Sequence, residues 1–386
     1  MKILIINYEY PPLGGGGGIF TRDLVEEFVR EGHYVDVVTT HFKGLSLYEK
    51  INGVNIYRVK VLCRKSLEIA TILSLLTFPI LAFLKALILC ARNKYDVINT
   101  HFAVPSGIVS LILVKILRIP SVLSILGGDI FDPSKKLSPH RHFLFRRAVK
   151  MVLNNAEIVI AESTDTAKNA RKYYNFNKQI NVIPIGIPRK IFFSSSRAEL
   201  DMDKNNIYLI SVGRLVKRKR YDILIKAFNI VLKKINNSQL IILGDGPEKQ
   251  NLFELAETLG ILNKIKFAGR VTDEQKNQYL QNSDLYILSS EHEGFGIVIL
   301  EAMSHGLPII STNIGGQTDI ITSSKNGILI NPNDEEEMAR AIISLALDER
   351  ARKIMAVNNK QYFNNYDIKV TAKKYIDIFE KVISIV

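Results

Sequence analysis

Residues 289–308 read SSEHEGFGIVILEAMSHGLP and follow directly on the apolar run Leu285–Leu288. The run predicts a buried strand, Gly294–Gly296 predicts a turn, and the apolar residues after it predict a short helix that ends at Gly306. A strand, a glycine turn and a helix N-terminus together form an anion site, because unpaired backbone N–H groups and the helix dipole point outward there.

Two carboxylates flank this predicted anion site. Glu293 lies in the turn, and Glu301 lies about one turn inside the helix. Helical side chains lean toward the N-terminus, so Glu301 can reach over the mouth of its own helix. Phosphates at the mouth, with carboxylates beside them, suit a ligand that carries both phosphate and hydroxyl groups, such as a nucleotide sugar.

Strand-like apolar runs alternate with helical patterns along the chain. They are Ile3–Ile6, Tyr34–Thr39, Val97–Thr100, Ser121–Ile125, Ile158–Ala161, Asn181–Ile183, Ile207–Val212, Gln239–Leu243, Ile265–Ala268, Leu285–Leu288, Ile309–Thr312 and Gly327–Ile330. Short apolar strands alternating with helices predict an α/β fold with parallel sheets covered on both faces. The proline-rich Pro184–Pro188 and the polar Ser194–Asn206 divide the runs into two series. The 386 residues therefore predict two doubly wound domains, with a ligand bound in the cleft between them at the carboxyl ends of the strands.

Composition and the N-terminus indicate a cytoplasmic protein. The chain is 47% hydrophobic and 23% charged, as is typical of a folded soluble protein. Cys63 and Cys90 have no metal or redox spacing, which suits a reducing cytosol. The four apolar residues Ile3–Ile6 are too few for a signal-peptide core, so we expect a first buried strand and no export.

The net charge of +13 is unevenly distributed. Residues 1–190 hold 26 Lys and Arg against 14 Asp and Glu, whereas residues 191–386 hold 25 against 24. An excess of positive charge in one half of the chain indicates a binding partner, and it says nothing of the fold. Nucleic acid, an anionic membrane surface and an acidic substrate all fit it, and so does a solvated basic surface without a partner.

The segment Ile69–Leu84 is the most hydrophobic part of the chain. It has 16 residues without a charge and contains Pro79. A spanning helix needs about 20 apolar residues, so we expect a helix packed in the first domain, with a helix lying partly in a membrane surface as the alternative. The basic and aromatic Arg141–Lys150 could add contacts with lipid headgroups, or could form an ordinary solvated helix. Peripheral attachment to the inner face of the cell membrane is therefore a hypothesis.

Five consecutive glycines, Gly14–Gly18, follow the first strand and precede a helical pattern. Such a loop allows close approach of the backbone to a ligand, although a mobile loop would have the same composition. The dinucleotide fingerprint is not met, because Ile19 occupies the sixth position from Gly14. Asp36 lies inside its strand, away from the end where a ribose-binding acid would sit. These features disfavour an NAD enzyme.

Basic and glycine-rich turns follow the strands of the second domain. Arg214 and Lys219, five residues apart, come just after the strand Ile207–Val212 and could clamp a diphosphate. Two further tight turns, at Gly244–Glu248 and Phe267–Val271, are expected to face the same cleft.

Together these elements resemble glycosyltransferase family 4, the retaining GT-B enzymes, over essentially the whole chain. The matching residues are Pro11-Pro12, Gly14–Gly18, Glu31-Gly32-His33, Val212–Leu215 with Lys219, Gly244–Pro247, Glu293–Gly296, Glu301-Ala302, Gly306–Pro308, Gly315-Gly316 and Asn326-Gly327. The pair of glutamates at 293 and 301, eight positions apart in this glycine and proline context, is the most specific of these signals.

The resemblance implies a domain organisation and a set of site residues. Residues 1–188 would form the acceptor-side domain, residues 189–368 the nucleotide-sugar domain, and residues 369–386 a helix that packs back on the first. The implied catalytic residues are Glu293, Arg214, Lys219, His101 and Asp129. The implied donor-binding residues are Gly15, Gly16, Gly17, Arg214, Lys219, Gly244, Arg270, Glu293, Gly294, Phe295, Gly296, Ile297 and Glu301.

The resemblance also implies the roles. Arg214 and Lys219 would hold the donor diphosphate, Glu301 would bind the ribose hydroxyls, and Glu293 would meet the transferred sugar. The backbone at 295–297 would approach sugar and phosphate, while the loop of Gly14–Gly18 would close over the reacting centre.

The chain departs from the family pattern at two positions. Many members have His-Gly-x-Asp after the strand that corresponds to Ser121–Ile125, whereas this chain has Leu126 at the histidine position. A base is therefore absent there, and His101 and Asp129 are candidates to orient the acceptor hydroxyl, with the leaving phosphate as a possible proton acceptor. The second departure is Arg220, where a glycine commonly follows the lysine.

The predicted function is retaining transfer of a hexose from a nucleoside-diphosphate sugar to a glycan, glycolipid or lipid-linked acceptor, in cell-surface polysaccharide or glycoconjugate synthesis. A GT-B nucleotide-sugar epimerase is one alternative. A basic nucleic-acid-binding protein is a remote one, because no aromatic-basic motif for it is present. Neither metal nor cofactor is expected, because cations and helix-mouth N–H groups can oppose the charge that develops on phosphate. The D-x-D-like Asp201-Met202-Asp203 lies in the polar linker.

Overall fold

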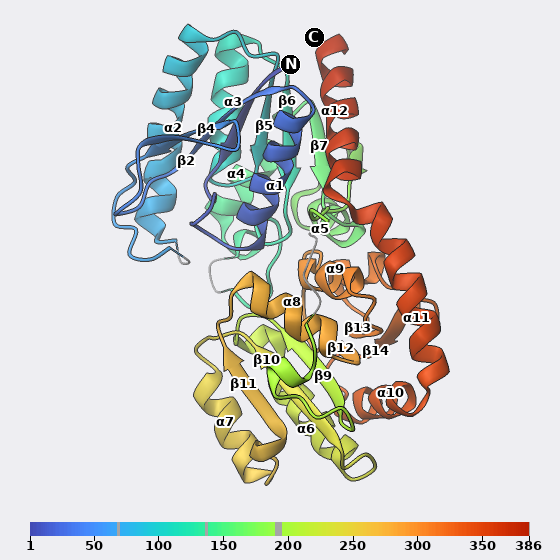
Figure 1. Cartoon of the computed structure of the whole chain (residues 1–386). Coiled ribbons are helices and arrows are strands. Elements are labelled where there is room, and N and C mark those ends of the chain that lie inside the picture. The colour runs from blue at the N-terminus through green and yellow to red at the C-terminus, as the bar shows by residue number, and fades with distance from the viewer. Residues whose placement is uncertain (68–69, 136–137, 190–194, 386) are drawn as a thin grey trace. The chain divides into compact units, whose positions relative to one another are not determined.

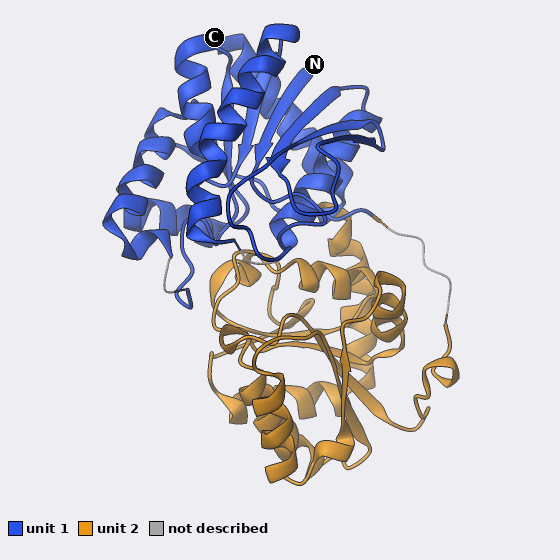
Figure 2. Cartoon of the chain, turned by 90° about the vertical axis from the view of Figure 1, so that its left-hand side faces the viewer, with its two compact units in different colours: residues 1–188, 366–386 blue, residues 189–365 orange. Residues whose placement is uncertain are grey.

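The structure is a computed structural model that describes residues 1–67, 70–135, 138–189 and 195–385. The ends of three predicted segments, at Ile69, Ser194 and Val386, lie outside these residues. The chain forms two compact units, shown in blue and orange in Figure 2. Unit 1 is Met1–Pro188 with Tyr366–Val386, and unit 2 is Arg189–Asn365.

Unit 1 is built on an eight-stranded sheet with the order β3-β4-β2-β1-β5-β6-β7-β8 (Figure 1). The strands are β1 Lys2–Asn7, β2 Tyr34–Thr40, β3 Tyr48–Ile51, β4 Val54–Val59, β5 Val97–His101, β6 Ser121–Ile125, β7 Ile158–Ala161 and β8 Ile180–Val182. All neighbours pair in parallel except β3 and β4. The apolar runs predicted as strands in this half therefore lie in one sheet, and β1 and β5 are adjacent at its centre.

The antiparallel hairpin of β3 and β4 is absent from the predicted elements. Its turn is Asn52-Gly53, with φ of 48° and 85°. Asn-Gly between two short runs is a strong hairpin signal, because both central residues of the matching turn need positive φ. Three of the four residues of β3 are exposed, so its sequence shows no apolar run and a search for such runs misses it.

Helices cover both faces of this sheet. They are α1 Gly16–Arg30, α2 Ile72–Arg92, α3 Ser106–Leu117, α4 Phe143–Asn155, α5 Thr164–Tyr174 and α12 Ile368–Ile385. The α1 crossover runs from β1 toward β2, whereas those of α2, α3 and α4 run in the other direction across the sheet. Right-handed crossovers then place α1 on one face and α2, α3 and α4 on the other. The last helix, α12, packs on α1, where the rings of Phe28 and Phe379 lie 5.5 Å apart.

The helix α2 is longer than the apolar segment that predicts it. A capping box between Thr71 and Ser74 starts it, and it continues through Pro79 and past Lys85 to Arg92, over 21 residues. The predicted helix length, too short to span a membrane, is therefore wrong, because Lys85 does not end the helix. Within the described part of the chain, it is the one helix long and apolar enough to cross a membrane, by length and composition only. Only 28% of its most apolar window is buried.

Unit 2 has a six-stranded parallel sheet with the order β11-β10-β9-β12-β13-β14. Its strands are β9 Ile207–Val212, β10 Ser238–Leu243, β11 Ile265–Gly269, β12 Leu285–Leu288, β13 Ile309–Thr312 and β14 Gly327–Ile330. Its α-helices are α6 Tyr221–Leu232, α7 Lys249–Thr258, α8 Asp273–Asn282, α9 Ile297–Ser304, α10 Glu335–Leu347 and α11 Glu349–Tyr362. The apolar faces of α6 and α10 join the strands in one core. Each predicted strand of this half is present, within one residue at either end.

Candidate functional site

The centre of the unit 2 sheet is a topological switch point. From β9 the chain crosses to β10 on one side, and later returns to β12 on the other side of β9. Ligands of open α/β sheets bind outside the carboxyl ends of the strands at such a point. The loop after β9 carries Arg214 and Lys219, and the loop after β12 carries Glu293. The fold thus places three of the predicted site residues in two loops, and it brings Lys219 into contact with Glu293, 74 residues away.

Glu293 is the centre of a buried charged cluster. Its Oε1 accepts hydrogen bonds from Lys219 Nζ at 2.5 Å and from Ser290 Oγ at 2.7 Å. Its Oε2 lies 3.4 Å from Arg218 Nη1. Burial alone would raise the pKa of this carboxyl, but the two cations lower it to about 2. Glu293 is therefore ionised throughout the physiological pH range.

Close contacts between glycines fix the loops around this cluster. A Cβ at Gly316 would lie 1.9 Å from the carbonyl oxygen of Gly294, and a Cβ at Gly244 would lie 1.9 Å from that of Gly213. The Gly316 N–H also donates to Glu293 O at 2.9 Å. Only glycine permits such approach of one backbone to another. The predicted glycines therefore hold the loops after β9, β10, β12 and β13 against one another.

Arg214 differs from the other cations of this loop. Its side chain is exposed and makes no hydrogen bond or ion pair with any residue in the described ranges. Its neighbour Gly213 lies against Lys219, whose Nζ would be 3.4 Å from a Cβ at that glycine. The loop therefore presents a buried ammonium already paired with Glu293, next to the residue that carries a guanidinium open to solvent.

The predicted helix after the Gly-Phe-Gly turn is α9, and Gly296 caps it with φ of 106°. Glu301 lies in its second turn and accepts a hydrogen bond from Lys276 Nζ of α8 at 2.7 Å. Burial alone would lower the pKa of Lys276, but Glu301 and Asp273 raise it above its ordinary value. The Glu301 carboxylate is thus held by a cation, and its remaining lone pairs are available to hydroxyl donors.

Three residues that contact Glu293 or Glu301 are not among the predicted site residues: Arg218, Ser290 and Lys276. Arg218 belongs to the basic run around Lys219, which was a usable signal. Lys276 lies 25 residues from Glu301 on another helix, and no spacing in the sequence connects the two.

Arg220 occupies the position where family members commonly have glycine, and its backbone explains that preference. Its φ is 48°, a left-handed conformation that glycine adopts without strain. Here the side chain donates to Asp222 and to Glu291 at 2.7–3.0 Å, and also to Asn333. These bonds join the start of α6 to the loop that carries Glu293.

The remaining predicted residues of unit 2 lie in the same set of loops. Phe295 is buried, Ile297 is the first residue of α9, and Arg270 is exposed just after β11. Because β11, β10, β9 and β12 are neighbours in the sheet, the loops after them lie in a row at the carboxyl ends of the strands.

In unit 1 the helix begins inside the glycine run, at Gly16, with Gly15 as its N-cap. The run is thus half loop and half first turn of α1. A Cβ at Gly17 would lie 2.7 Å from the ring of Phe102 and 3.5 Å from Leu126 Cδ1. Leu126, at the histidine position of the family pattern, is buried and close to the start of α1.

His101 ends β5 and has no exposed surface. Its Nδ1 is 2.7 Å from Thr21 Oγ1 and its Nε2 is 2.8 Å from Asn99 Oδ1. Burial lowers its pKa to about 3, so the ring is neutral at pH 7. A ring in this position can reach a substrate only if its neighbours move.

Asp129 is also buried, after β6. Its Oδ2 accepts the N–H of Ala103 at 2.5 Å, and its Oδ1 accepts that of Leu126 at 2.9 Å. Burial raises its pKa to about 6, although these backbone bonds act in the opposite direction. The carboxyl therefore ties the loop after β5 to the loop after β6.

Asp129→Asn should change how stability depends on pH. The folded pKa lies above the ordinary 3.8, so folding favours the protonated acid. The contribution of Asp129 to stability should therefore rise by roughly 2 kcal/mol as pH falls from 7 to 4. Asn cannot titrate, so the free energy of unfolding of the wild type should increase relative to that of the variant as pH falls over this range. Urea titrations at pH 7, 6, 5 and 4 measure it, and a constant difference would contradict the assignment.

Ligand-type side chains do not cluster into a metal site among the residues that the structure describes. No group of three or more His, Cys, Asp or Glu is placed to hold an ion there. Asp201 caps a short 3₁₀ helix with φ of 56°, and Asp203 Oδ1 accepts the N–H of Asn205. The D-x-D-like segment thus lies in a turn of unit 2.

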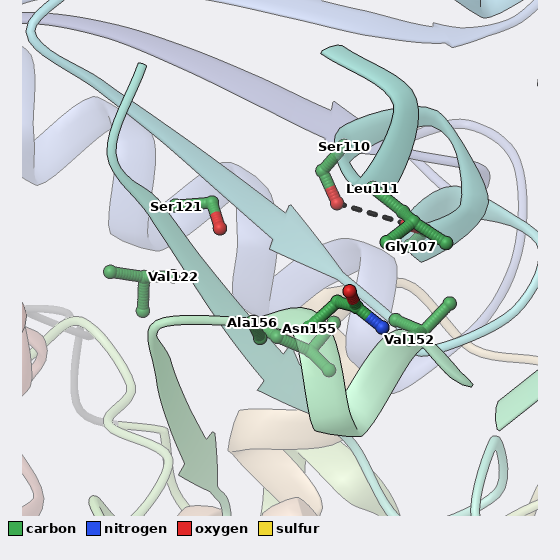
Figure 3. Close-up of a pocket in the computed structure, with 9 residues that line it drawn as sticks. Gly107, Ser110, Leu111, Ser121, Val122, Val152, Asn155 and Ala156 are labelled. Atoms are coloured by element: carbon green, nitrogen blue, oxygen red, sulfur yellow. Dashed lines mark hydrogen bonds between the residues drawn. The ribbon is translucent and has the colours of Figure 1, made fainter. Parts of the chain in front are cut away.

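A small pocket in unit 1 has no part in these sites (Figure 3). It lies between α3, β6 and the end of α4, and contains none of the predicted site residues. Ser110 on its wall already donates to Gly107 O at 3.0 Å. We assign it no function.

Comparison with known families matches both halves of the chain. The family described as Glycosyltransferase Family 4 matches residues 14–190, and the one described as Glycosyl transferases group 1 matches residues 192–362. An uncharacterized glycosyltransferase of Methanocaldococcus jannaschii is 30% identical, over 98% of each chain. A putative teichuronic acid biosynthesis glycosyltransferase of Bacillus subtilis is 29% identical, over 65% of this chain and 61% of its own length.

Solved structures with the same fold cover the whole chain. Sucrose-phosphate synthase from Thermosynechococcus elongatus matches with a TM-score of 0.86 at 21% identity, over 100% of both chains. An Anabaena protein (HepE) solved in complex with UDP and glucose matches with a TM-score of 0.77 at 22% identity, over 99% of this chain and 100% of its own. The predicted fold, two doubly wound parallel-sheet domains of the GT-B class, is confirmed.

Proposed function

This chain belongs to glycosyltransferase family 4, and we propose from this premise that it moves a sugar from a nucleoside-diphosphate sugar to a glycan, glycolipid or lipid-linked acceptor. The observation that carries the proposal is the Glu293 cluster at the switch point of unit 2. It combines an ionised carboxylate, two buried or half-buried cations and a nearby exposed Arg214. This set suits a ligand that carries a diphosphate and a polyhydroxy group.

The charged side chains of unit 2 indicate how the donor would bind. Breaking the bond between sugar and diphosphate develops negative charge on the leaving phosphate, and fixed cations oppose it without reorganisation. Arg214 supplies a fork for two phosphate oxygens, and Lys219 supplies a point charge. Glu293 faces the sugar hydroxyls, and Glu301 accepts hydrogen bonds from the ribose. Divalent metal is then not required, because the guanidinium and ammonium groups supply the positive charge.

Retention of the anomeric configuration is part of the proposal. It rests on family membership, together with the way in which Glu293 is held. Glu293 is held by three side chains at its own loops. A tightly held carboxylate can orient sugar hydroxyls more readily than it can activate a water or an acceptor.

The proposed acceptor side lies in unit 1. Asp129 and His101 lie at the carboxyl ends of β6 and β5 in unit 1, beside the β1–β5 switch point. We propose that Asp129 orients the acceptor through the loops that it ties together. The relative from Bacillus subtilis supports a role in cell-surface polysaccharide synthesis.

A screen of nucleotide sugars tests the proposal. The solved Anabaena protein holds UDP, so UDP-sugars come first, followed by GDP- and ADP-sugars. We expect release of the nucleoside diphosphate from one donor, faster with a lipid-linked or glycan acceptor, unchanged by EDTA, and a product with the anomeric configuration of the donor by NMR. Sugar product formed equally without acceptor would favour an epimerase. No turnover of any donor would contradict the proposal.

A further inference from the structure

The helices α2, α3 and α4 cover one face of the unit 1 sheet, and α2 and α3 lie side by side there (Figure 1). The outward side of α2 is apolar along its whole length. Its exposed large residues recur at about every fourth position: Ile72, Leu73, Leu76, Ile80, Leu84 and Ile88, the most exposed being Ile80 at 64%. At 1.5 Å per residue, this stripe is about 24 Å long.

The neighbouring helices also carry exposed apolar residues. Ile112 and Ile116 of α3 are exposed, and Phe143 and Leu144 at the start of α4 are 73% and 76% exposed. Single exposed apolar side chains are common on soluble proteins, but a continuous row such as that along α2 marks an interaction surface.

Charge on the same helices is of one sign. The three helices together contain six basic residues and no acidic one: Lys85, Arg92, Lys115, Arg146, Arg147 and Lys150. All but Lys85, which is half-buried, are exposed. On α10, by contrast, three acids open the helix and Arg340 follows.

We propose that this face docks on an anionic lipid bilayer. The aliphatic stripe of α2 enters the level of the headgroups and first methylenes, while the surrounding lysines and arginines contact lipid phosphates. A second copy of this chain fits less well, because the like charges of two such faces would meet. A spanning arrangement fits less well too, because Phe78, Ala82, Ala86 and Leu89 on the inner side of α2 are packed in the core of unit 1. The docking is independent of the donor chemistry.

A single tryptophan reports the docking directly, because the chain contains none. Ile80→Trp places one on the stripe, and Leu347→Trp places one at an apolar position of unit 2 that is 71% exposed. With vesicles of phosphatidylcholine and about one-third phosphatidylglycerol, we expect a blue shift and quenching by brominated lipids for Ile80→Trp only. Vesicles of phosphatidylcholine alone should give neither.

Flotation with the same vesicles tests the contributions of the apolar stripe and of the basic residues to binding. Leu76→Glu with Ile80→Glu should reduce binding at least tenfold, whereas Leu347→Glu with Ile354→Glu should leave it unchanged. Replacing Arg146, Arg147 and Lys150 by glutamine should weaken binding by roughly fivefold per charge, and salt should release the wild type. All these positions are exposed, and circular dichroism checks that the variants fold.

Three outcomes would overturn the proposal. Equal vesicle binding by the stripe variant and its control would show that the stripe has no role in docking. Dimers of the wild type that Leu76→Glu with Ile80→Glu converts to monomers, without vesicle binding, would identify a second copy as the occupant. Binding that resists high salt would indicate insertion of α2. Transfer to a soluble acceptor needs no membrane, so failure of docking would leave the proposed function untouched.

Discussion

Glu293→Gln should reduce sugar transfer by about 10²–10³-fold, the cost typical of one preorganised group that acts at the reacting centre. The amide keeps the volume and can still accept from Ser290 Oγ, but it no longer balances Lys219 and Arg218. Transfer rate at saturating donor and thermal unfolding, both at pH 7, measure the two effects.

The same variant should be less stable, because the ion pair is buried. The folded pKa of Glu293 is about 2 against the ordinary 4.5, so the carboxylate contributes roughly 3 kcal/mol above pH 4.5, and this contribution is lost as pH falls toward 2. The variant should therefore be destabilised at pH 7, and the difference from wild type should shrink below pH 4.5. Glu336→Gln, on the exposed side of α10, is the control and should change neither rate nor stability. Wild-type transfer by Glu293→Gln would remove this residue from the site.

Arg214→Ala should reduce transfer by about 100-fold without affecting stability. Its side chain is exposed and has no partner in the described residues, so its loss should change the free energy of unfolding by less than about 0.5 kcal/mol. A catalytic loss without a stability loss is the signature of a residue whose partner is the substrate. Initial rates over a range of donor concentrations, together with urea titration, provide the measurement.

Two further variants sharpen the result. Arg214→Lys should recover part of the rate, because an ammonium supplies charge without the fork that binds two phosphate oxygens. Lys226→Ala removes an exposed cation from α6, outside the site, and should behave as wild type. Equal rates for Arg214→Ala and Lys226→Ala would contradict the diphosphate assignment.

The sequence predicts the elements better than their partners. The apolar runs of unit 2 predict each of its strands within a residue, because buried parallel strands are continuously apolar. The hairpin of β3 and β4 escapes that criterion, since β3 is exposed at the sheet edge, although Asn52-Gly53 marks its turn. The length of α2 escapes it too, because Lys85 interrupts the apolar segment without ending the helix.

The sequence predicts which residues belong to the site, but it does not predict which of them contact each other. Arg214, Lys219, Glu293 and Glu301 could be picked out from their motifs. That Lys219 binds Glu293, and Lys276 binds Glu301, depends on loops brought together from separate strands. The burial of His101 could not be predicted either, because a histidine after a strand has the same sequence pattern whether it is exposed or, as here, fully buried.

Calorimetric titration of the full chain with UDP, GDP and ADP tests the central claim most directly, because it measures the proposed donor site without any acceptor. We expect one of the three to bind at a single site with a dissociation constant between about 1 µM and 1 mM, the range typical of enzyme substrates. Arg214→Ala should weaken that binding at least tenfold, and Lys226→Ala should not. Binding of none of the three, or equal binding by wild type and Arg214→Ala, would contradict the account.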